Sequence, residues 1–265
     1  GKRDSGIDTD KLRRRSEEIT AWMRNHGVSC VTASQGGYPE LLRELYDPPY
    51  LLYQLGDPFP ADIPAFAIVG TRNATRTGLE AAYRLGREAG AAGIPTVSGL
   101  AGGIDQAAHA GTLSARGGTW AVLGSGLARI YPASARSLVS RILREGGGLI
   151  SEYEPTSPPQ RWHFPQRNRI ISGLCRATCV VEAPVRSGAL ITAEFALEQG
   201  RDVYVHACST GTGRQSGQSG GTKRLAEEGA PVLSSMREVC LDWGMDCSSW
   251  PDRQQYPVSE EIHYR

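Results

Sequence analysis

From residue 65 onward, short apolar runs alternate with longer segments in which apolar residues recur every three or four positions. The apolar runs, which predict buried strands, cover 65–70, 94–99, 119–124, 148–152, 178–183, 202–207 and 231–233. The intervening segments, which predict helices, cover 78–92, 104–114, 135–144, 190–198 and 222–228. Apolar strands that alternate with helices are typical of a sheet with both faces covered. The sequence therefore predicts an α/β fold with a mostly parallel, doubly wound sheet and helices on both faces.

The pattern is weaker at the two ends of the chain. Before residue 65 it predicts a helix over 11–26, a strand over 28–33, a short helix over 38–45 and a strand over 51–56. After about residue 235 the alternation is lost. We therefore predict a short N-terminal helical lead-in over 1–37, one domain over 38–235, and a C-terminal tail or packed extension over 236–265.

Four turns between a predicted strand and the next helix are built from small residues. They are 70–72, 98–103, 124–126 and 187–188, and each allows a ligand to approach the backbone closely. Right-handed crossovers place all such turns at the carboxyl edge of the sheet. The first amide groups of a helix lack partners, and the helix dipole adds partial positive charge, so this edge favours anions. The turns therefore predict a phosphate-binding surface.

Positive charge is concentrated between residues 161 and 186. This stretch contains Arg161, Arg167, Arg169, Arg176 and Arg186 against one acid, Glu182. The whole chain has a formal net charge of only +1, so the concentration is local. Because an arginine fork matches phosphate oxygens, we expect Arg72, Arg167 and Arg169 to contact phosphate. For Arg169 the alternative is an ion pair within the fold.

Aromatic residues accompany this basic segment. Phe164 is either a core residue or a platform on which a nucleic-acid base stacks, and Trp162 could also stack on a base. His163, beside Trp162, could touch a base or a phosphate.

The common cofactor motifs are missing from the sequence. No Walker lysine motif is present, and 124–129 has only the first two glycines of a dinucleotide fingerprint. The scattered cysteines indicate reduced thiols rather than metal ligands, which fits a cytoplasmic protein. No apolar run approaches the roughly 20 residues of a membrane span. We expect no cofactor, no metal and no membrane partner.

Two features leave an enzymatic function open. Asp105 and His109 lie four residues apart on one predicted helix face, which suits acid–base or metal chemistry. The alternative is that Asp105 braces the turn and His109 hydrogen-bonds to it. Glu194 loosely resembles a glutamate of the phosphoribohydrolases, although the paired glycines and threonine of their motif are missing. The second interpretation is therefore a Rossmann-like nucleotide-binding sensor or a phosphoribohydrolase-like enzyme that acts on a small nucleotide.

Six ordered segments together resemble the successive motifs of the DNA-processing protein A family, also called DprA or Smf. They are 67–78, 97–113, 121–132, 150–155, 164–174 and 180–205. The resemblance implies an extended Rossmann-like domain that binds single-stranded DNA and forms homodimers. It also implies a non-enzymatic role in natural transformation and recombination, in which the protein protects incoming DNA and helps to load the RecA recombinase.

The turns and the resemblance together define the predicted site. The DNA- and phosphate-binding residues are expected to be Gly70, Arg72, Ser98, Gly99, Gly102, Gly126, Phe164, Arg167, Asn168, Arg169, Ser187, Gly188 and Lys223. The chain departs from the family pattern at 128–129, Ala135, 206–208 and Lys223. We expect none of the predicted site residues to be catalytic.

Overall fold

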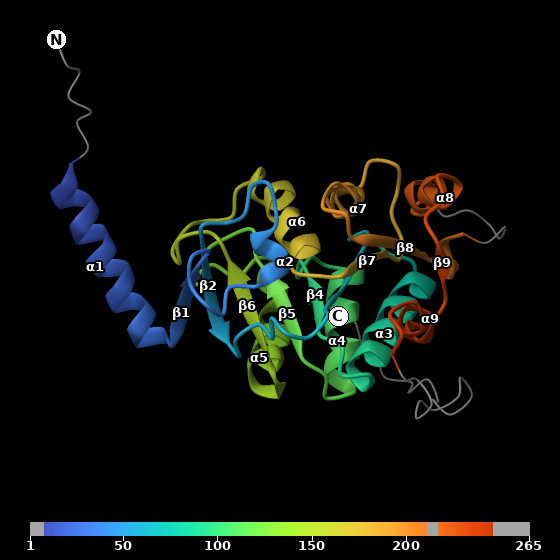
Figure 1. Cartoon of the computed structure of the whole chain (residues 1–265), viewed down its shortest axis with the longest axis horizontal. Helices are drawn as coiled ribbons and strands as arrows, with labels where there is room; N and C mark the ends of the chain where they lie inside the picture. Colours follow the sequence, from blue (N-terminus) through green and yellow to red (C-terminus); the bar gives the residue numbers. More distant parts are fainter. Residues whose placement is uncertain (1–7, 211–216, 246–265) are drawn as a thin grey trace, which may run out of the picture.

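A computed structural model of the chain describes residues 8–210 and 217–245. In this part, one nine-stranded sheet has the strand order β1-β2-β6-β5-β4-β3-β7-β8-β9 (Figure 1). The strands are β1 (Val28–Thr32), β2 (Leu51–Gly56), β3 (Phe66–Val69), β4 (Thr96–Ser98), β5 (Thr119–Val122), β6 (Gly147–Ser151), β7 (Ala177–Val180), β8 (Asp202–His206) and β9 (Val232–Leu233). In this order, all neighbouring strands in the run β6-β5-β4-β3-β7-β8-β9 are parallel. At one edge of the described sheet, β1 pairs with β2 and β2 pairs with β6 in the antiparallel direction.

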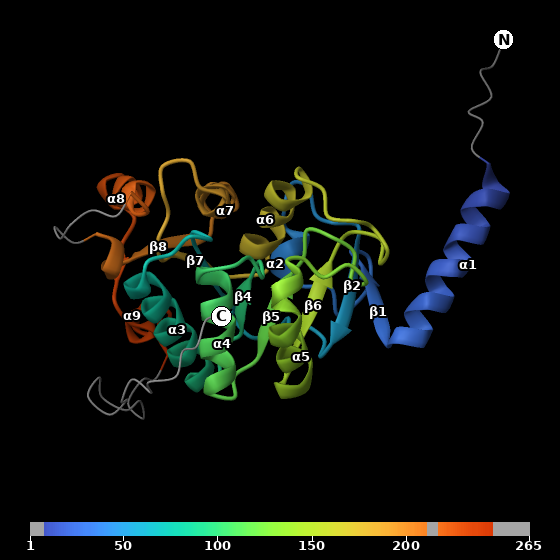
Figure 2. The same ribbon diagram turned by 180° about the vertical axis from the view of Figure 1, so that it is seen from behind.

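Helices cover both faces of this sheet. They are α1 (Thr9–His26), α2 (Glu40–Arg43), α3 (Arg76–Ala91), α4 (Ile104–Ser114), α5 (Arg136–Glu145), α6 (His163–Gly173), α7 (Gly188–Glu198), α8 (Gly220–Glu227) and α9 (Met236–Asp242). Helices α3, α4, α5 and α9 lie on one face, and α2, α6, α7 and α8 lie on the other (Figures 1 and 2). The predicted fold class, a mostly parallel, doubly wound sheet, is confirmed. Within the described residues, no helix is both long and apolar enough to span a membrane.

The central strands are buried on both sides because alternate residues face opposite layers. In β3, Phe66 and Ile68 pack toward α3 and α4, whereas Ala67 and Val69 pack toward α6 and α7. All four side chains are at most 3% exposed. A fully buried Phe side chain such as that of Phe66 contributes about 1.5–3 kcal/mol to folding. The continuous apolar runs of the sequence are therefore explained by burial on two faces.

Helices α3 and α4 pack against each other at unusually close range. A Cβ atom at Gly111 would collide with the carbonyl oxygen of Tyr83, and one at Gly86 would collide with that of Ala108. Glycine at these positions therefore allows the two helix backbones to touch. The close contact fixes how α4 lies against α3.

Strand β1 and helix α9, near the two ends of the described chain, are part of the main body, whereas α1 projects away from it (Figures 1 and 2). Strand β1 pairs with β2 from Val28 opposite Leu55 to Thr32 opposite Leu51, so the sheet extends across the boundary expected after residue 37. At the other end, α9 buries Met236 and Val239 in the core beneath α3. Residues 236–242 are thus a packed helix, and residues 246–265 of the expected tail lie outside the described residues.

Candidate functional site

The sheet has a topological switch point between β3 and β7. From β3 the chain continues into α3 on one face, whereas from β7 it continues into α7 on the other face. The connections therefore diverge, and ligands of open α/β sheets bind in the crevice that this leaves at the carboxyl ends of the strands. A cavity of about 580 Å³ lies there. Its walls come from the turns after β3 and β7, from the first turns of α6, and from Ala101, Asp105 and Tyr131.

Among the described residues, four arginines and one carboxylate line the cavity. The arginines are Arg72, Arg161, Arg167 and Arg186, and the carboxylate is Asp105. Arg72, Arg161 and Arg186 are exposed to solvent. Within residues 8–210 and 217–245, none of these three forms an ion pair. Their charges are therefore available to an anionic ligand.

Arg167 lies at the floor of the cavity and is held there by the sheet. Its side chain donates to the carbonyl oxygens of Gly99, at 2.8 Å, and of Val122. Burial lowers the pKa of Arg167 to about 10, against the opposing effect of Asp105, so the guanidinium remains charged at neutral pH. Arg167 is a fixed, partly desolvated cation beside the ligand space.

Asp105 braces the turn after β4. Its Oδ2 atom accepts from the amide nitrogens of Gly99, at 3.1 Å, and Ala101, at 3.3 Å. Burial raises the pKa of Asp105 to about 6, although Arg167 and the backbone amides oppose this shift. The bracing role that the sequence offered as an alternative to acid–base chemistry is confirmed.

His109 does not join Asp105. Its Nδ1 atom lies 2.7 Å from Oγ1 of Thr119, and that hydroxyl itself donates to the carbonyl oxygen of Thr96. Nδ1 must therefore carry the proton. Burial lowers the pKa of His109 to about 3, so the ring is neutral. The hydrogen bond between His109 and Asp105, which the sequence offered as an alternative, is wrong, because His109 bonds Thr119 on β5 instead. Among the described residues, no cluster of His, Cys, Asp and Glu could hold a metal ion.

An aromatic edge borders the charged cavity. The Arg72 guanidinium lies 5.7 Å from the centre of the Phe164 ring. Phe164 in turn meets Tyr131, with ring centres 5.4 Å apart and planes tilted by 52°. A smaller cavity of about 220 Å³ adjoins this group and is also lined by Gly99 and Gly102. Phe164 therefore belongs to the cavity wall and not to the core.

The start of α7 closes the opposite wall. Oγ of Ser187 accepts from the amide of Ala189 at 3.2 Å and so caps the helix. The Asn168 side chain donates to the carbonyl oxygen of Gly188 at 3.0 Å, which ties α6 to this turn. An added Cβ at Gly188 would have no atom within 4 Å, so the backbone here is open to a ligand.

Nine of the predicted site residues line these two cavities. They are Gly70, Arg72, Gly99, Gly102, Phe164, Arg167, Asn168, Ser187 and Gly188. The lining residues that were not predicted include Arg161, Arg186 and Tyr131. The local excess of arginine already pointed to the first two, but no pattern placed Tyr131 at the site.

Four predicted site residues lie outside both cavities. The Ser98 hydroxyl is fully buried and donates to the carbonyl oxygen of Ile68 at 2.6 Å, which links β4 to β3. A side chain at Gly126 would collide with the backbone of 154–155, so this glycine serves close packing. Lys223 lies on α8 and does not line either cavity. Ser98 and Gly126 therefore serve the packing of the fold, and the fourth of these residues is Arg169.

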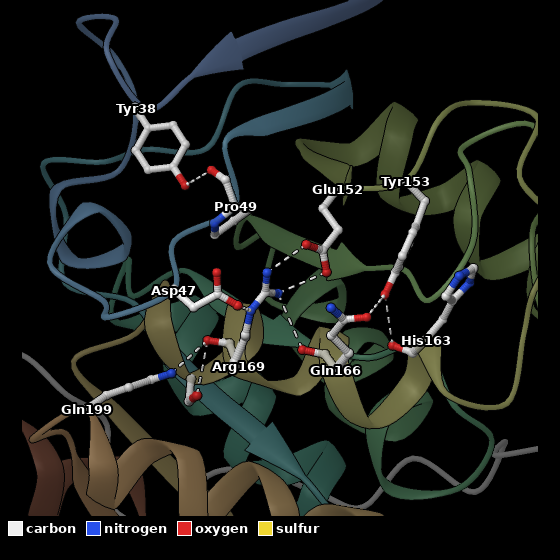
Figure 3. Close-up of polar contacts among 10 residues, drawn as sticks. Tyr38, Asp47, Pro49, Glu152, Tyr153, His163, Gln166, Arg169 and Gln199 are labelled. Atoms are coloured by element: carbon white, nitrogen blue, oxygen red, sulfur yellow. Dashed lines mark hydrogen bonds and ion pairs between the residues drawn. The ribbon is translucent and has the colours of Figure 1, made fainter. Parts of the chain in front are cut away.

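Arg169 points to the side of α6 that faces away from the cavity. Its two terminal nitrogens bond the two carboxylate oxygens of Glu152 at 2.9 and 2.7 Å (Figure 3). The intramolecular ion pair, offered as the alternative for this residue, is the arrangement found. Glu194 also lies apart: it is exposed on α7 and does not line the cavity, so the resemblance to phosphoribohydrolases is not supported by its position.

The fold and the cavity define a class: a Rossmann-like α/β protein with an arginine-lined cavity at the switch point of the sheet. The sequence specifies the family within that class. Residues 29–244 match the family described as DNA recombination-mediator protein A, and the chain belongs to this family.

Several characterised relatives are similar over most of the chain. The DNA processing protein DprA of Bacillus subtilis is 38% identical over 222 residues, which cover 83% of this chain and 73% of the relative. The DprA of Streptococcus pneumoniae is 40% identical over 208 residues, covering 78% of this chain and 71% of the relative. The Smf protein of Synechocystis is 41% identical over 81% of this chain, which spans only 54% of that longer protein.

Solved structures of relatives have the same fold. The crystal structure of S. pneumoniae DprA matches with a TM-score of 0.76 and 34% identity, over 89% of this chain and 83% of that chain. The DprA of Helicobacter pylori, whose structure concerns its mode of binding single-stranded DNA, matches with a TM-score of 0.71 and 27% identity. That match covers 82% of this chain and 95% of that one.

Proposed function

We propose that the arginine-lined cavity binds the backbone of single-stranded DNA. The observation that carries the proposal is that Arg72, Arg161 and Arg186 meet in one open cavity without ion-pair partners among the described residues. Arginine forks match phosphate oxygens, and the open turn at Gly188 lets a backbone approach. The single-strand binding of the H. pylori relative supports the same assignment.

The aromatic edge makes a single strand a better ligand than a duplex. Bases of a flexible strand can turn toward Phe164 and Tyr131 while its phosphates contact the arginines, and each stacked base contributes about 1–3 kcal/mol. A duplex hides its base faces and resists the bending that the cavity requires. The cavity is lined mainly by turns and by parts of α6 and α7, and this recessed arrangement does not place a helix in a major groove. We therefore propose little sequence selectivity.

The biological role that we propose follows from the family. As a recombination mediator, the protein protects incoming single strands and helps to load the RecA recombinase during natural transformation. It acts as a homodimer in the cytoplasm. The 38% identity to the B. subtilis DNA processing protein supports this assignment.

We propose that the site binds without catalysing a reaction. The one carboxylate of the cavity, Asp105, is engaged by two backbone amides, and Glu194 lies elsewhere on α7. A hydrolase acting on a nucleotide needs a positioned acid or base near the scissile bond. This observation favours DNA binding over a small-nucleotide enzyme or sensor.

Competition binding tests the proposal. A fluorescent single-stranded oligonucleotide is bound to the protein, and unlabelled single strand, matched duplex or nucleoside monophosphate is then added. The proposal requires that the unlabelled strand compete far better than the duplex and that the monophosphate compete weakly. A monophosphate that competes as well as the strand would assign the cavity to a small nucleotide.

A further inference from the structure

Helix α6 presents its ligand-facing and its anchoring side chains in opposite directions. Phe164, Arg167 and Asn168 line the cavity, whereas Arg169 extends away from it toward the end of β6 (Figure 3). There the Arg169 guanidinium forms two bonds with Glu152, and both side chains are nearly buried, with 10% and 13% of their surfaces exposed. Bidentate pairs of this kind fix geometry as well as charge.

Glu152 belongs to a rigid part of the molecule. It directly follows β6, which pairs with β5 on one side and with β2 on the other. The ion pair therefore ties α6 to an interior strand of the sheet. Asp47, at 3.5 Å from Nε of Arg169, adds a weaker contact, because 75% of its side chain is exposed.

Two further contacts hold the same helix. The hydroxyl of Tyr153, the residue after Glu152, lies 3.3 Å from both the His163 carbonyl oxygen and the Gln166 side-chain oxygen. The Tyr153 ring stacks on that of His163, with centres 3.8 Å apart. The Gln199 amide, just after α7, donates to the carbonyl oxygen of Arg169 at 3.0 Å (Figure 3). These contacts converge on the side of α6 that faces away from the ligand space.

The cavity depends on where this helix lies. Arg167 reaches the carbonyl oxygen of Gly99 at 2.8 Å, and Asn168 reaches that of Gly188 at 3.0 Å, so a shift of α6 would break contacts on both cavity walls. Burial lowers the pKa of Arg169, but bonding to Glu152 outweighs this and raises it above its ordinary value. The Arg169 guanidinium thus stays charged throughout the physiological pH range.

We infer that Arg169 and Glu152 are a positioning pair for single-strand binding: they set the place of α6, and through it Phe164, Arg167 and Asn168, without contacting the ligand. The consequence for DNA rests on the proposed function. The effect of the pair on the position of α6 does not rest on the proposed function. The position of the helix and its effect on DNA binding can therefore be tested separately.

The first measurement needs no DNA. Hydrogen exchange of the backbone amides is compared in the parent protein, Glu152→Gln and Arg169→Lys. We expect the amides of 163–168 to exchange at least several-fold faster in Glu152→Gln, with those of β3 unchanged. In Arg169→Lys, which keeps the charge and one bond, the exchange rates should lie between those of the parent and of Glu152→Gln. Unchanged exchange over 163–168 would overturn the inference even if the protein bound no DNA.

The second measurement separates positioning from direct phosphate contact. The affinity for a single-stranded oligonucleotide is measured over a salt series for the parent, Glu152→Gln, Arg169→Lys and Arg169→Ala. We expect Glu152→Gln and Arg169→Ala to bind about tenfold more weakly, as for the loss of one charge-assisted hydrogen bond, with an unchanged salt slope. Arg169→Lys should recover part of the loss. A matched control is Arg141→Ala on α5, which breaks another two-bond Arg–Glu pair, with Glu145 at 3.1 and 3.2 Å, on the opposite face.

Two outcomes of the salt series would overturn the inference. A slope reduced by about 0.7 in Arg169→Ala would make this arginine a phosphate contact. Parental affinity in both Glu152→Gln and Arg169→Ala would show that the cavity does not need the pair. If the parent itself failed to bind the strand, the proposed function would fall, and the exchange measurement would still decide the positioning role.

Discussion

The guanidinium of Arg72 lies 5.7 Å from the centre of the Phe164 ring, within the range of a cation–π contact. This pair joins the turn after β3 to the first turn of α6, two segments far apart in the chain. It places a charge suited to phosphate beside a ring suited to a base. One point of the cavity therefore offers a partner both for the phosphate and for the base of a single strand.

Replacing Arg72 with Ala should weaken single-strand binding by about 1–3 kcal/mol, the contribution of a charge-assisted hydrogen bond. The side chain is exposed, so the free energy of unfolding should stay near that of the parent. Titration with a labelled oligonucleotide measures the first effect and chemical denaturation the second. The control is Arg76→Ala, because Arg76 is exposed on α3 and is already paired with Glu80 at 2.8 Å. Equal affinities of the Arg72 and Arg76 variants would contradict the assignment.

Replacing Arg167 with Ala should lower both DNA affinity and stability. The sequence alone predicts a phosphate contact for Arg167. In the structure, however, Arg167 is only 4% exposed and donates to the carbonyl oxygens of Gly99 and Val122. Each buried group left without a partner costs about 1–3 kcal/mol. A chemical-denaturation midpoint equal to that of the parent would show that these two bonds contribute little.

The affinity for a single strand should rise as the pH is lowered from 7 to 5. Asp105 has a pKa of about 6, raised by burial, so it becomes neutral in this range and stops opposing the cavity arginines. Asp105→Asn should bind at pH 7 about as well as the parent does at pH 5, with a flatter profile. The Asn oxygen can still accept from both amides, since both bonds end on one oxygen of Asp105. Binding titrations at fixed ionic strength measure this, and a parental profile in Asp105→Asn would assign the effect to another group.

The same pKa gives a prediction for stability. The folded-state pKa of Asp105 is raised from 3.8 to about 6, so between these values the folded protein binds a proton that the unfolded chain does not. Its contribution to the free energy of unfolding is therefore largest below pH 4 and falls as the pH rises toward 6. Denaturation is measured for the parent and for Asp105→Asn over this range. The free energy of unfolding of the parent should fall relative to that of Asp105→Asn as the pH rises. A constant difference would mean that Asp105 titrates as an ordinary carboxylate.

The protein should release neither base nor phosphate from nucleoside monophosphates or triphosphates. No acid or base of the described residues is both at the cavity and free of structural bonds, because Asp105 holds the turn after β4. Chromatography of long incubations is a sufficient assay. Release that disappears in Glu194→Gln would instead support the nucleotide-acting enzyme.

Much of the fold could be predicted because the strands are buried on both faces and therefore appear as uninterrupted apolar runs. The carboxyl-edge turns, including those at Gly70 and Gly188, followed from strand–helix order and crossover handedness. Arg169 was misplaced for a geometric reason. Residues two apart on a helix do not share a face, so Arg167 and Arg169 cannot both point into one cavity. That rule becomes usable only once α6 is known to begin at His163.

Other features had no sequence signal at all. Ser98 bonds a carbonyl oxygen on a neighbouring strand, and His109 prefers Thr119 on β5 to the aspartate one helical turn away. In both cases the hydrogen-bond partner is distant in sequence, so the sequence does not indicate it. Tyr131 reaches the cavity from the connection that follows β5, and its pairing with Phe164 depends on the path of that connection.

The account depends most directly on the claim that the cavity takes a single strand through its phosphates. The decisive measurement is a salt series on matched single-stranded and double-stranded oligonucleotides with the parent protein. We predict much tighter binding of the single strand, with log K falling against log salt by about 0.7 for each phosphate neutralised. Equal affinity for the two forms, or a single-strand affinity that does not change with salt, would contradict it.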